Sequence, residues 1–179
     1  MLQNNLFEIW LFLRCYPYTI LEIGTRTGMS LFNKLAFRPN GAACLVMSTD
    51  LYVEQGLPNL VERNLRQMKI GTSGVCYMRG DSQEVVPALA AAMAEVRYKY
   101  ILVDASHEAE GAWTDMITAI PLLAPGRIIV FDDAGPTEDG TGYNLISVWD
   151  DVMTSHSGVI NNKHYDVPYG SCVGRRSAA

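Results

Sequence analysis

The sequence has too few cysteines, and too few clustered basic residues, for several common classes of protein. Its four cysteines lie far apart and form no Cys-x-x-Cys pair, which argues against a disulfide framework and against a zinc site. Basic residues gather only at Arg175 and Arg176, and the formal net charge is −5. Because binding to phosphates needs a basic face, we exclude a nucleic acid as the main partner.

No apolar run in the sequence is long enough to span a bilayer. The most apolar stretch, residues 6–18, is interrupted by Glu8 and Arg14 and is shorter than the roughly 20 residues that a spanning helix needs. The first residues also lack the basic start and the small-residue cleavage site of a signal peptide. We therefore expect a cytoplasmic protein that does not contact a membrane.

What the sequence does have is a regular alternation of apolar runs and helix-like segments. The apolar runs, which predict strands, are residues 18–24, 42–50, 74–82, 98–104 and 127–133. The segments that predict helices between and after them are residues 28–37, 57–70, 82–96, 110–124 and 142–155. Strands without polar alternation indicate a sheet covered on both faces, and alternation with helices makes such a sheet parallel.

The last part of the chain has a different pattern. Residues 161–176 contain Asn, Pro and Gly turn signals without a helical period, and they predict two short strands in an antiparallel edge hairpin. The sequence thus predicts a single α/β domain over residues 1–179, with a doubly wound, mostly parallel, seven-stranded sheet. In this prediction residues 1–17 form an N-terminal helix and residues 18–179 form the core.

Glycines follow the first predicted strand, where ligands bind in sheets of this kind. Gly24 and Gly28 suit a tight turn before a helix, although a purely structural turn explains them about as well. Arg26 stands where a dinucleotide-binding motif has its middle glycine, so NAD is the least favoured ligand. Glu22 ends the same apolar strand, and a buried carboxylate is costly unless some group donates hydrogen bonds to it.

Acids also end the next two predicted strands. Asp50 lies 22 residues after Gly28, an offset at which an acid commonly accepts hydrogen bonds from a ribose. Asp81 and Ser82 end the third strand and could face an adenine. The alternative for Asp50 and for Asp81 with Ser82 is a helix N-cap or a turn.

Three further acids end the fourth and fifth predicted strands. Asp104, Asp132 and Asp133 would repel one another if these strands are neighbours, and a hard cation such as Mg²⁺ would relieve the repulsion. The alternative is ordinary turn chemistry. His107, just beyond Asp104, could take a proton from a substrate hydroxyl, although a lone histidine is more often a surface or capping residue.

Five stretches, taken in order, resemble the successive motifs of class I S-adenosylmethionine (SAM)-dependent methyltransferases. They are LEIGTRTGMS, STD, RGDSQE, ILVDASHEAEG and LLAPGRIIVFDD. The resemblance runs from about Thr19 to the C-terminus and is closest to the small metal-dependent O-methyltransferases, including the catechol-type and macrocin-type enzymes. It implies a Rossmann-like methyltransferase fold, SAM and Mg²⁺ as cofactors, and a small hydroxylated acceptor such as a sugar or a catechol-like diol.

The resemblance also implies roles for individual residues. The implied SAM contacts are Glu22, Gly24, Thr25, Gly28, Ser30, Asp50, Leu51, Asp81, Ser82 and Asp104. The implied Mg²⁺ ligands are Asp104, Asp132 and Asp133. His107 falls at the position of a general base, beside Asp104 as the second catalytic residue.

The sequence departs from the family pattern at two places. Residues 125–127 read Pro-Gly-Arg where the family often has two glycines, and Ala109 stands where an aromatic residue often follows the histidine. Only one predicted helix precedes the first strand, so the acceptor pocket is either open or completed by a second copy in a homo-oligomer. Two other functions stay open beside O-methyl transfer: a non-catalytic SAM-binding protein, and a hydroxylase-type enzyme on the same fold, because cephalosporin hydroxylase domains share the Asp-x-x-His and Asp-Asp pattern.

Overall fold

The computed structural model describes residues 19–26, 28–36, 45–51, 57–67, 74–135, 143–165 and 170–178. The predicted N-terminal helix lies outside these residues. No helix among them is long and apolar enough to cross a membrane.

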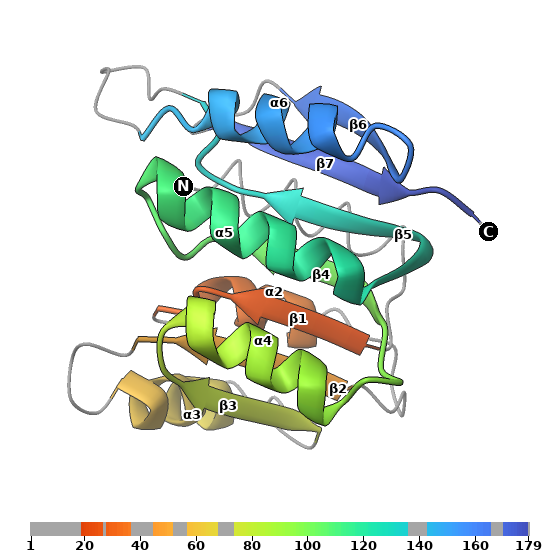
Figure 1. Ribbon diagram of the computed structural model, residues 1–179. Coiled ribbons are helices and arrows are strands. Elements are labelled where there is room, and N and C mark those ends of the chain that lie inside the picture. The colour runs from red at the N-terminus through yellow and green to blue at the C-terminus, as the bar shows by residue number, and fades with distance from the viewer. Residues whose placement is uncertain are drawn as a thin grey trace.

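The described residues form one seven-stranded sheet with the strand order β3-β2-β1-β4-β5-β7-β6 (Figure 1). The strands from β1 to β5 are parallel, and β7 pairs antiparallel with both β5 and β6. This arrangement confirms the predicted parallel sheet and its antiparallel C-terminal hairpin. The strands are β1 (Thr19–Ile23), β2 (Leu45–Asp50), β3 (Val75–Arg79), β4 (Tyr98–Val103), β5 (Leu123–Phe131), β6 (Ile160–Tyr165) and β7 (Ser171–Arg176).

Helices cover both faces of the sheet. They are α2 (Met29–Ala36), α3 (Leu57–Gln67), α4 (Ser82–Ala92), α5 (Ala109–Ala119), the 3₁₀ turn η1 (Ile120–Leu122) and α6 (Ile146–Ser155). One buried cluster joins α4, α5 and α6 to the face that Figure 1 shows toward the viewer. A second buried cluster joins α2 and α3 to the opposite face. The sheet is therefore doubly wound.

Strand β4 shows why the sequence lacks polar alternation here. Tyr100 and Leu102 belong to the α2/α3 cluster, whereas Ile101 and Val103 belong to the α4/α5/α6 cluster, and all four are at most 1% exposed. A strand in the middle of a doubly wound sheet has no solvent-facing side, so both sets of side chains are apolar.

The boundary between α5 and β5 differs from the prediction. The sequence predicted a helix over residues 110–124 and a strand from Arg127, but α5 ends at Ala119 and β5 begins at Leu123. Pro121 explains the early end, because a proline has no N–H to donate within a helix. The register between β4 and β5 then shifts, since Leu123 pairs with Tyr98 and Ile128 already pairs with Tyr100.

Candidate active site

The carboxyl ends of the central strands are held in line by backbone hydrogen bonds. The amide of Gly24 donates to the Thr49 carbonyl at 2.9 Å, that of Asp104 to the Ile23 carbonyl at 2.8 Å, and that of Asp132 to the Val103 carbonyl at 3.1 Å. Strand order reverses between β1 and β4, which is where sheets of this type bind ligands. The residues that follow β1, β2, β4 and β5 therefore share one rim.

Gly24 makes the contact between β1 and β4 possible. Its φ of +91° lies in the left-handed region, and a Cβ at this position would stand 1.7 Å from the backbone oxygen of Asp104. Only glycine allows this approach. Gly24 therefore lets the loop after β1 lie directly against the Asp104 backbone after β4.

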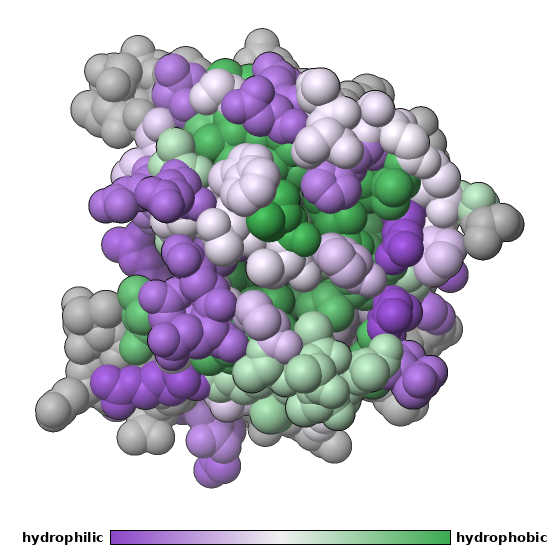
Figure 2. Space-filling model, in the orientation of Figure 1, coloured by the Kyte–Doolittle hydropathy of each residue, from purple (hydrophilic) through white to green (hydrophobic). Residues whose placement is uncertain are grey.

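A cavity of about 800 Å³ opens at this rim. Figure 2 shows hydrophilic residues gathered on the side of the molecule where the parallel strands of Figure 1 end. The predicted site residues that line the cavity are Gly24, Thr25, Ser30, Asp50, Leu51, Asp81, Ser82, Asp104, His107, Asp132 and Asp133. Glu22 and Gly28 do not line it. The volume falls within the range of about 300–1,000 Å³ that is usual for ligand sites.

Glu22 is completely buried and does not line the cavity, but it contacts Ser30, which does. Ser30 donates a hydrogen bond of 2.5 Å to Glu22 Oε1, and Lys34 Nζ lies 3.3 Å from Glu22 Oε2. Lys34 is itself only 1% exposed and lies 5.6 Å from the centre of the Tyr100 ring. The donors that the buried carboxylate required thus come from α2.

Asp50 and Thr25 shape the loop after β1. The backbone amide of Arg26, a residue with a φ of +45°, donates to Asp50 Oδ2 at 2.5 Å. The Thr25 hydroxyl shares a short hydrogen bond with that of Ser48. A carboxylate can accept up to about four hydrogen bonds, so the contact with Arg26 leaves Asp50 able to accept others.

Asp81 and Ser82 have structural partners. Asp81 is the N-cap of α4, and its Oδ1 accepts a hydrogen bond of 2.9 Å from the amide of Gln83. Ser82 donates a hydrogen bond of 2.6 Å to Oδ1 of Asp115 on α5. The N-cap alternative is therefore the observed conformation of Asp81, although both residues also line the cavity.

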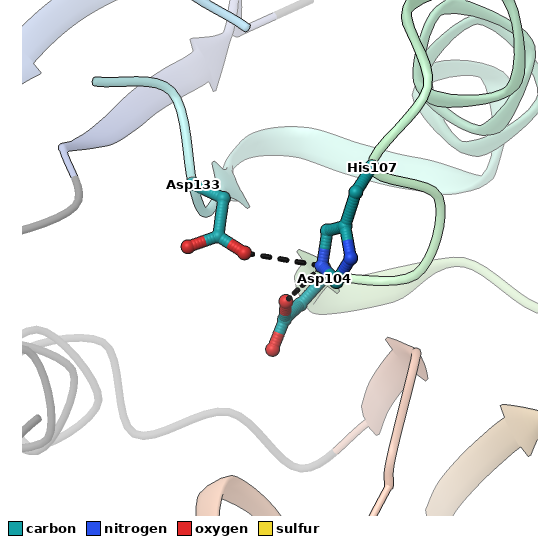
Figure 3. A group of neighbouring side chains, drawn as sticks. All are labelled: Asp104, His107 and Asp133. Atoms are coloured by element: carbon teal, nitrogen blue, oxygen red, sulfur yellow. Dashed lines mark ion pairs between the residues drawn. The ribbon is translucent and has the colours of Figure 1, made fainter. Parts of the chain in front are cut away.

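Asp104, His107 and Asp133 converge on one point of the rim (Figure 3). His107 Nε2 lies 3.1 Å from Asp133 Oδ2 and 3.9 Å from Asp104 Oδ1. One potential ligand atom from each of the three residues lies within 4.8 Å of those of the other two. Two carboxylates and an imidazole are donors that a divalent cation can use.

The same contacts change the acidity of His107. The nearby carboxylates of Asp104 and Asp133 favour the protonated ring, outweigh partial burial and raise the pKa of His107 to about 9. Without a cation, the ring is therefore protonated at neutral pH and bridges the two carboxylates. In that state it has no free lone pair with which to act as a base.

The structure does not bring Asp132 into this group. Asp132 Oδ1 accepts a hydrogen bond of 2.7 Å from the hydroxyl of Ser171 on β7, and burial raises the pKa of Asp132. Asp133, by contrast, has a φ of +55°, in the left-handed region. This change of backbone direction explains why consecutive aspartates point to different places.

Several residues that line the cavity were not predicted from the sequence. Tyr143 stacks on the His107 ring with a centroid distance of 3.8 Å and an interplanar angle of 11°, and it is 52% exposed. Gln83, Met29 and Ser106 also line the cavity. Gln83 follows two predicted contacts and could have been found from its position, whereas Tyr143 is distant in sequence from every motif.

The family of the chain follows from a family model described as a methyltransferase domain. This model matches residues 21–134, which is more than half of the chain and includes the rim from β1 to the end of β5. The chain belongs to this methyltransferase family. No curated protein matches the sequence.

Solved structures show the same methyltransferase fold. An O-methyltransferase of tomaymycin synthesis from Streptomyces achromogenes, in complex with SAM, has a TM-score of 0.75 at 16% identity and covers 98% of this chain and 80% of its own. An O-methyltransferase from Bacillus cereus, in complex with S-adenosylhomocysteine (SAH), has a TM-score of 0.76 at 14% identity and covers 97% and 80%. An SAH-bound methyltransferase from Podospora anserina has a TM-score of 0.74 at 17% identity and covers 97% and 78%.

Proposed function

We propose that this methyltransferase moves the methyl group of SAM to a hydroxyl of a small acceptor. The observation that carries the proposal is the rim itself, where Asp50 stands at the end of β2 and Asp104, His107 and Asp133 lie beyond β4 and β5, around one cavity. Solved neighbours that share the fold hold SAM or SAH, and their names describe O-methyltransferases. A sugar or catechol-like diol is the acceptor class that we propose.

The half of the cavity near β1 and β2 fits a nucleoside. Asp50 can accept hydrogen bonds from ribose hydroxyls, and the loop at Gly24 and Thr25 offers close backbone approach to the methionine part. Asp81 and Ser82 form the wall proposed for the adenine, with Leu51 exposed at the edge of the cavity. Glu22 supports this half from below by fixing Ser30, which lines the cavity.

The other half fits a divalent cation. We propose Asp104 and Asp133 as its ligands, because Mg²⁺ is usually held by one or two carboxylates and keeps several waters. Asp132 is left out of the proposed ligand set because Ser171 holds its Oδ1. A bound cation would supply Lewis-acid stabilisation to an acceptor hydroxyl that loses its proton.

The chain's own residues would align the acceptor and receive its proton. Methyl transfer is an in-line displacement at a carbon already activated by the sulfonium, so positioning contributes much of the rate. We propose His107 as the base and Asp104 as its neighbour in the reaction. His107 can accept a proton only when its pKa has fallen, which is expected when a cation shares the charge of the two carboxylates.

Calorimetry with SAH tests the cofactor half of the proposal. Wild type should bind SAH, and Asp50→Ala should weaken binding at least about 10-fold, because it removes a charged acceptor of hydrogen bonds. Asp151→Ala is the matched control, since Asp151 is exposed on α6 and does not line the cavity. If wild type shows no binding, or Asp50→Ala binds as wild type does, the proposal fails.

Turnover on a panel of catechols, vicinal diols and nucleotide sugars tests the chemical half. Methylated product with one of these acceptors supports the proposal. SAH binding without turnover on any of them would instead favour a non-catalytic SAM-binding protein, a function consistent with the protonated His107 of the cation-free site.

A further inference from the structure

Asp115 is a buried carboxylate that the proposed reaction does not use. It lies on α5 with 0% exposure, and burial raises its pKa. Ser82 donates to its Oδ1 at 2.6 Å, while its Oδ2 has no hydrogen bond of good geometry among the described residues. A buried carboxylate is costly, and one with so few partners needs an explanation.

The surroundings of Asp115 suggest what it does. Ser82 is the first residue of α4, and a weaker contact from the Ser106 backbone lowers the pKa of Asp115. Ser82 and Ser106 both line the cavity, on segments that follow β3 and β4 respectively. One carboxylate behind the cavity therefore contacts two separate pieces of its wall.

The packing of α5 brings these pieces close. A Cβ at Gly111 would stand 2.1 Å from the Ser106 hydroxyl oxygen and 3.4 Å from Gln83 Nε2. Because Gly111 has no side chain, the loop of Ser106 and the first turn of α4 can both lie against α5. Asp115 is one helical turn further along the same helix, directly beneath them.

We propose that Asp115 is a positioning residue for the cofactor. By holding the Ser82 hydroxyl and lying against the Ser106 backbone, it sets the spacing of the two wall segments between which the adenine of SAM binds. This inference rests on the proposed function, since it assumes that SAM is the ligand. It also gives Ser82 a definite role. The Ser82 hydroxyl faces α5 and fixes the first turn of α4, and the rest of this turn forms the part of the cavity wall that faces the ligand.

The test is the affinity for SAH of two variants at Asp115, measured by calorimetry together with the melting temperature. Asp115→Ala removes the acceptor of the Ser82 hydroxyl and should weaken SAH binding by about 10-fold, as expected for the loss of a hydrogen bond to a buried carboxyl group. Asp115→Asn keeps an acceptor oxygen and should stay within about 3-fold of wild type. Val152→Ala is the matched control, because it also trims a buried helical side chain, on α6, but lies away from the cavity.

Two further measurements separate positioning from general stability. Asp115→Ala should raise the KM for SAM and leave kcat within about 2-fold, whereas Val152→Ala should lower the melting temperature and leave both unchanged. Ser82→Ala should also weaken SAH binding, by no more than Asp115→Ala does, and the double variant should lose no more than Asp115→Ala alone, because that change already removes the partner of Ser82.

The outcomes distinguish this inference from the proposed function. If wild type binds SAH and Asp115→Ala binds it equally well, the positioning role is wrong and the proposed function stands. If wild type does not bind SAH, both are wrong. Should Asp115→Ala fail to fold, Ser82→Ala decides alone: a weakened affinity supports the inference, and an unchanged affinity overturns it.

Discussion

Two clusters of charged side chains lie at the same rim of the sheet, and they differ in their partners. The inner cluster consists of Glu22, Lys34 and Asp132, and the outer cluster consists of Asp104, His107 and Asp133. The inner carboxylates are bound by Ser30, Lys34 and Ser171, so their hydrogen bonds are made within the protein. The outer groups are 19–35% exposed and pair with one another at the wall of the cavity, which Asp132 also lines.

An acid at a strand end is therefore not by itself a functional residue. Both clusters combine acids with one base, and both include an acid from the segment that follows β5. What separates them is the partner of each aspartate: Asp133, with its positive φ, contacts His107, whereas the neighbouring Asp132 accepts a hydrogen bond from Ser171. A left-handed conformation in a non-glycine residue is costly, and such strain is found most often where function requires it.

Removing the base of the inner cluster should have the largest effect. Lys34→Met leaves Glu22 as an unpaired buried charge, and breaking a buried ion pair on one side typically costs about 3–5 kcal/mol of unfolding free energy. Urea denaturation measures this loss. The double variant Glu22→Leu/Lys34→Met should recover much of the lost unfolding free energy. If Lys34→Met alone were as stable as wild type, the ion pair of Glu22 and Lys34 would not stabilise the fold.

Substituting the two adjacent aspartates one at a time should show that they differ in their effect on metal binding. Asp133→Asn should weaken the binding of Mg²⁺ or Mn²⁺ at least about 10-fold, because mutating even a residue that only contacts a metal ligand typically weakens metal binding by that factor. Asp132→Asn should change the affinity by less than about 3-fold, since Asn keeps the oxygen that accepts from Ser171. Calorimetry on metal-free protein measures both, and equal losses would mean that Asp132 is also a ligand.

The ring of Tyr143 should matter less. Tyr143→Ala removes the stack on His107, the proposed base, and aromatic pairs contribute about 0.5–1.5 kcal/mol, so kcat should fall by about 2- to 10-fold. Tyr143→Phe keeps the stack and is the matched control. An unchanged kcat in the alanine variant would show that Asp104 and Asp133 alone orient the imidazole.

The smallest expected effect is the pH dependence of the metal-free protein. The pKa of His107 is raised from 6.5 to about 9, so the stabilisation from its protonated ring is fully present below about pH 6.5 and is lost as the pH rises through 9. The difference in melting temperature between wild type and His107→Gln, measured in chelator, should therefore shrink over this interval. A constant difference would mean that the outer cluster does not bind a proton.

The sequence predicted the sheet, its helices and the rim because those depend on patterns that span many residues. The apolar run of β4 indicated burial on both faces, and the acids at strand ends had to meet once the strands were parallel. The need of Glu22 for donors was also predictable, although the sequence did not indicate that Ser30 and Lys34 would supply them.

The directions of individual side chains could not be predicted from the sequence as the fold could. Whether Asp132 or Asp133 contacts His107 depends on the local backbone, which has a positive φ at Asp133, and composition carries no signal for it. The stacking of Tyr143 on His107 joins segments that follow different strands, so no local motif predicts it. The hydroxyl of Ser82 faces α5 because Asp115, 33 residues later, accepts its hydrogen bond.

The missing side chain of Gly24 has a mechanical consequence. With nothing between the first loop and the Asp104 carbonyl, the segment proposed to hold the nucleoside and the segment that carries the acid of the outer cluster are in direct backbone contact. A displacement of either one would therefore press on the other. Donor and acceptor of the methyl group would then rest on a shared, rigid support, and their mutual distance would be fixed before either molecule arrives.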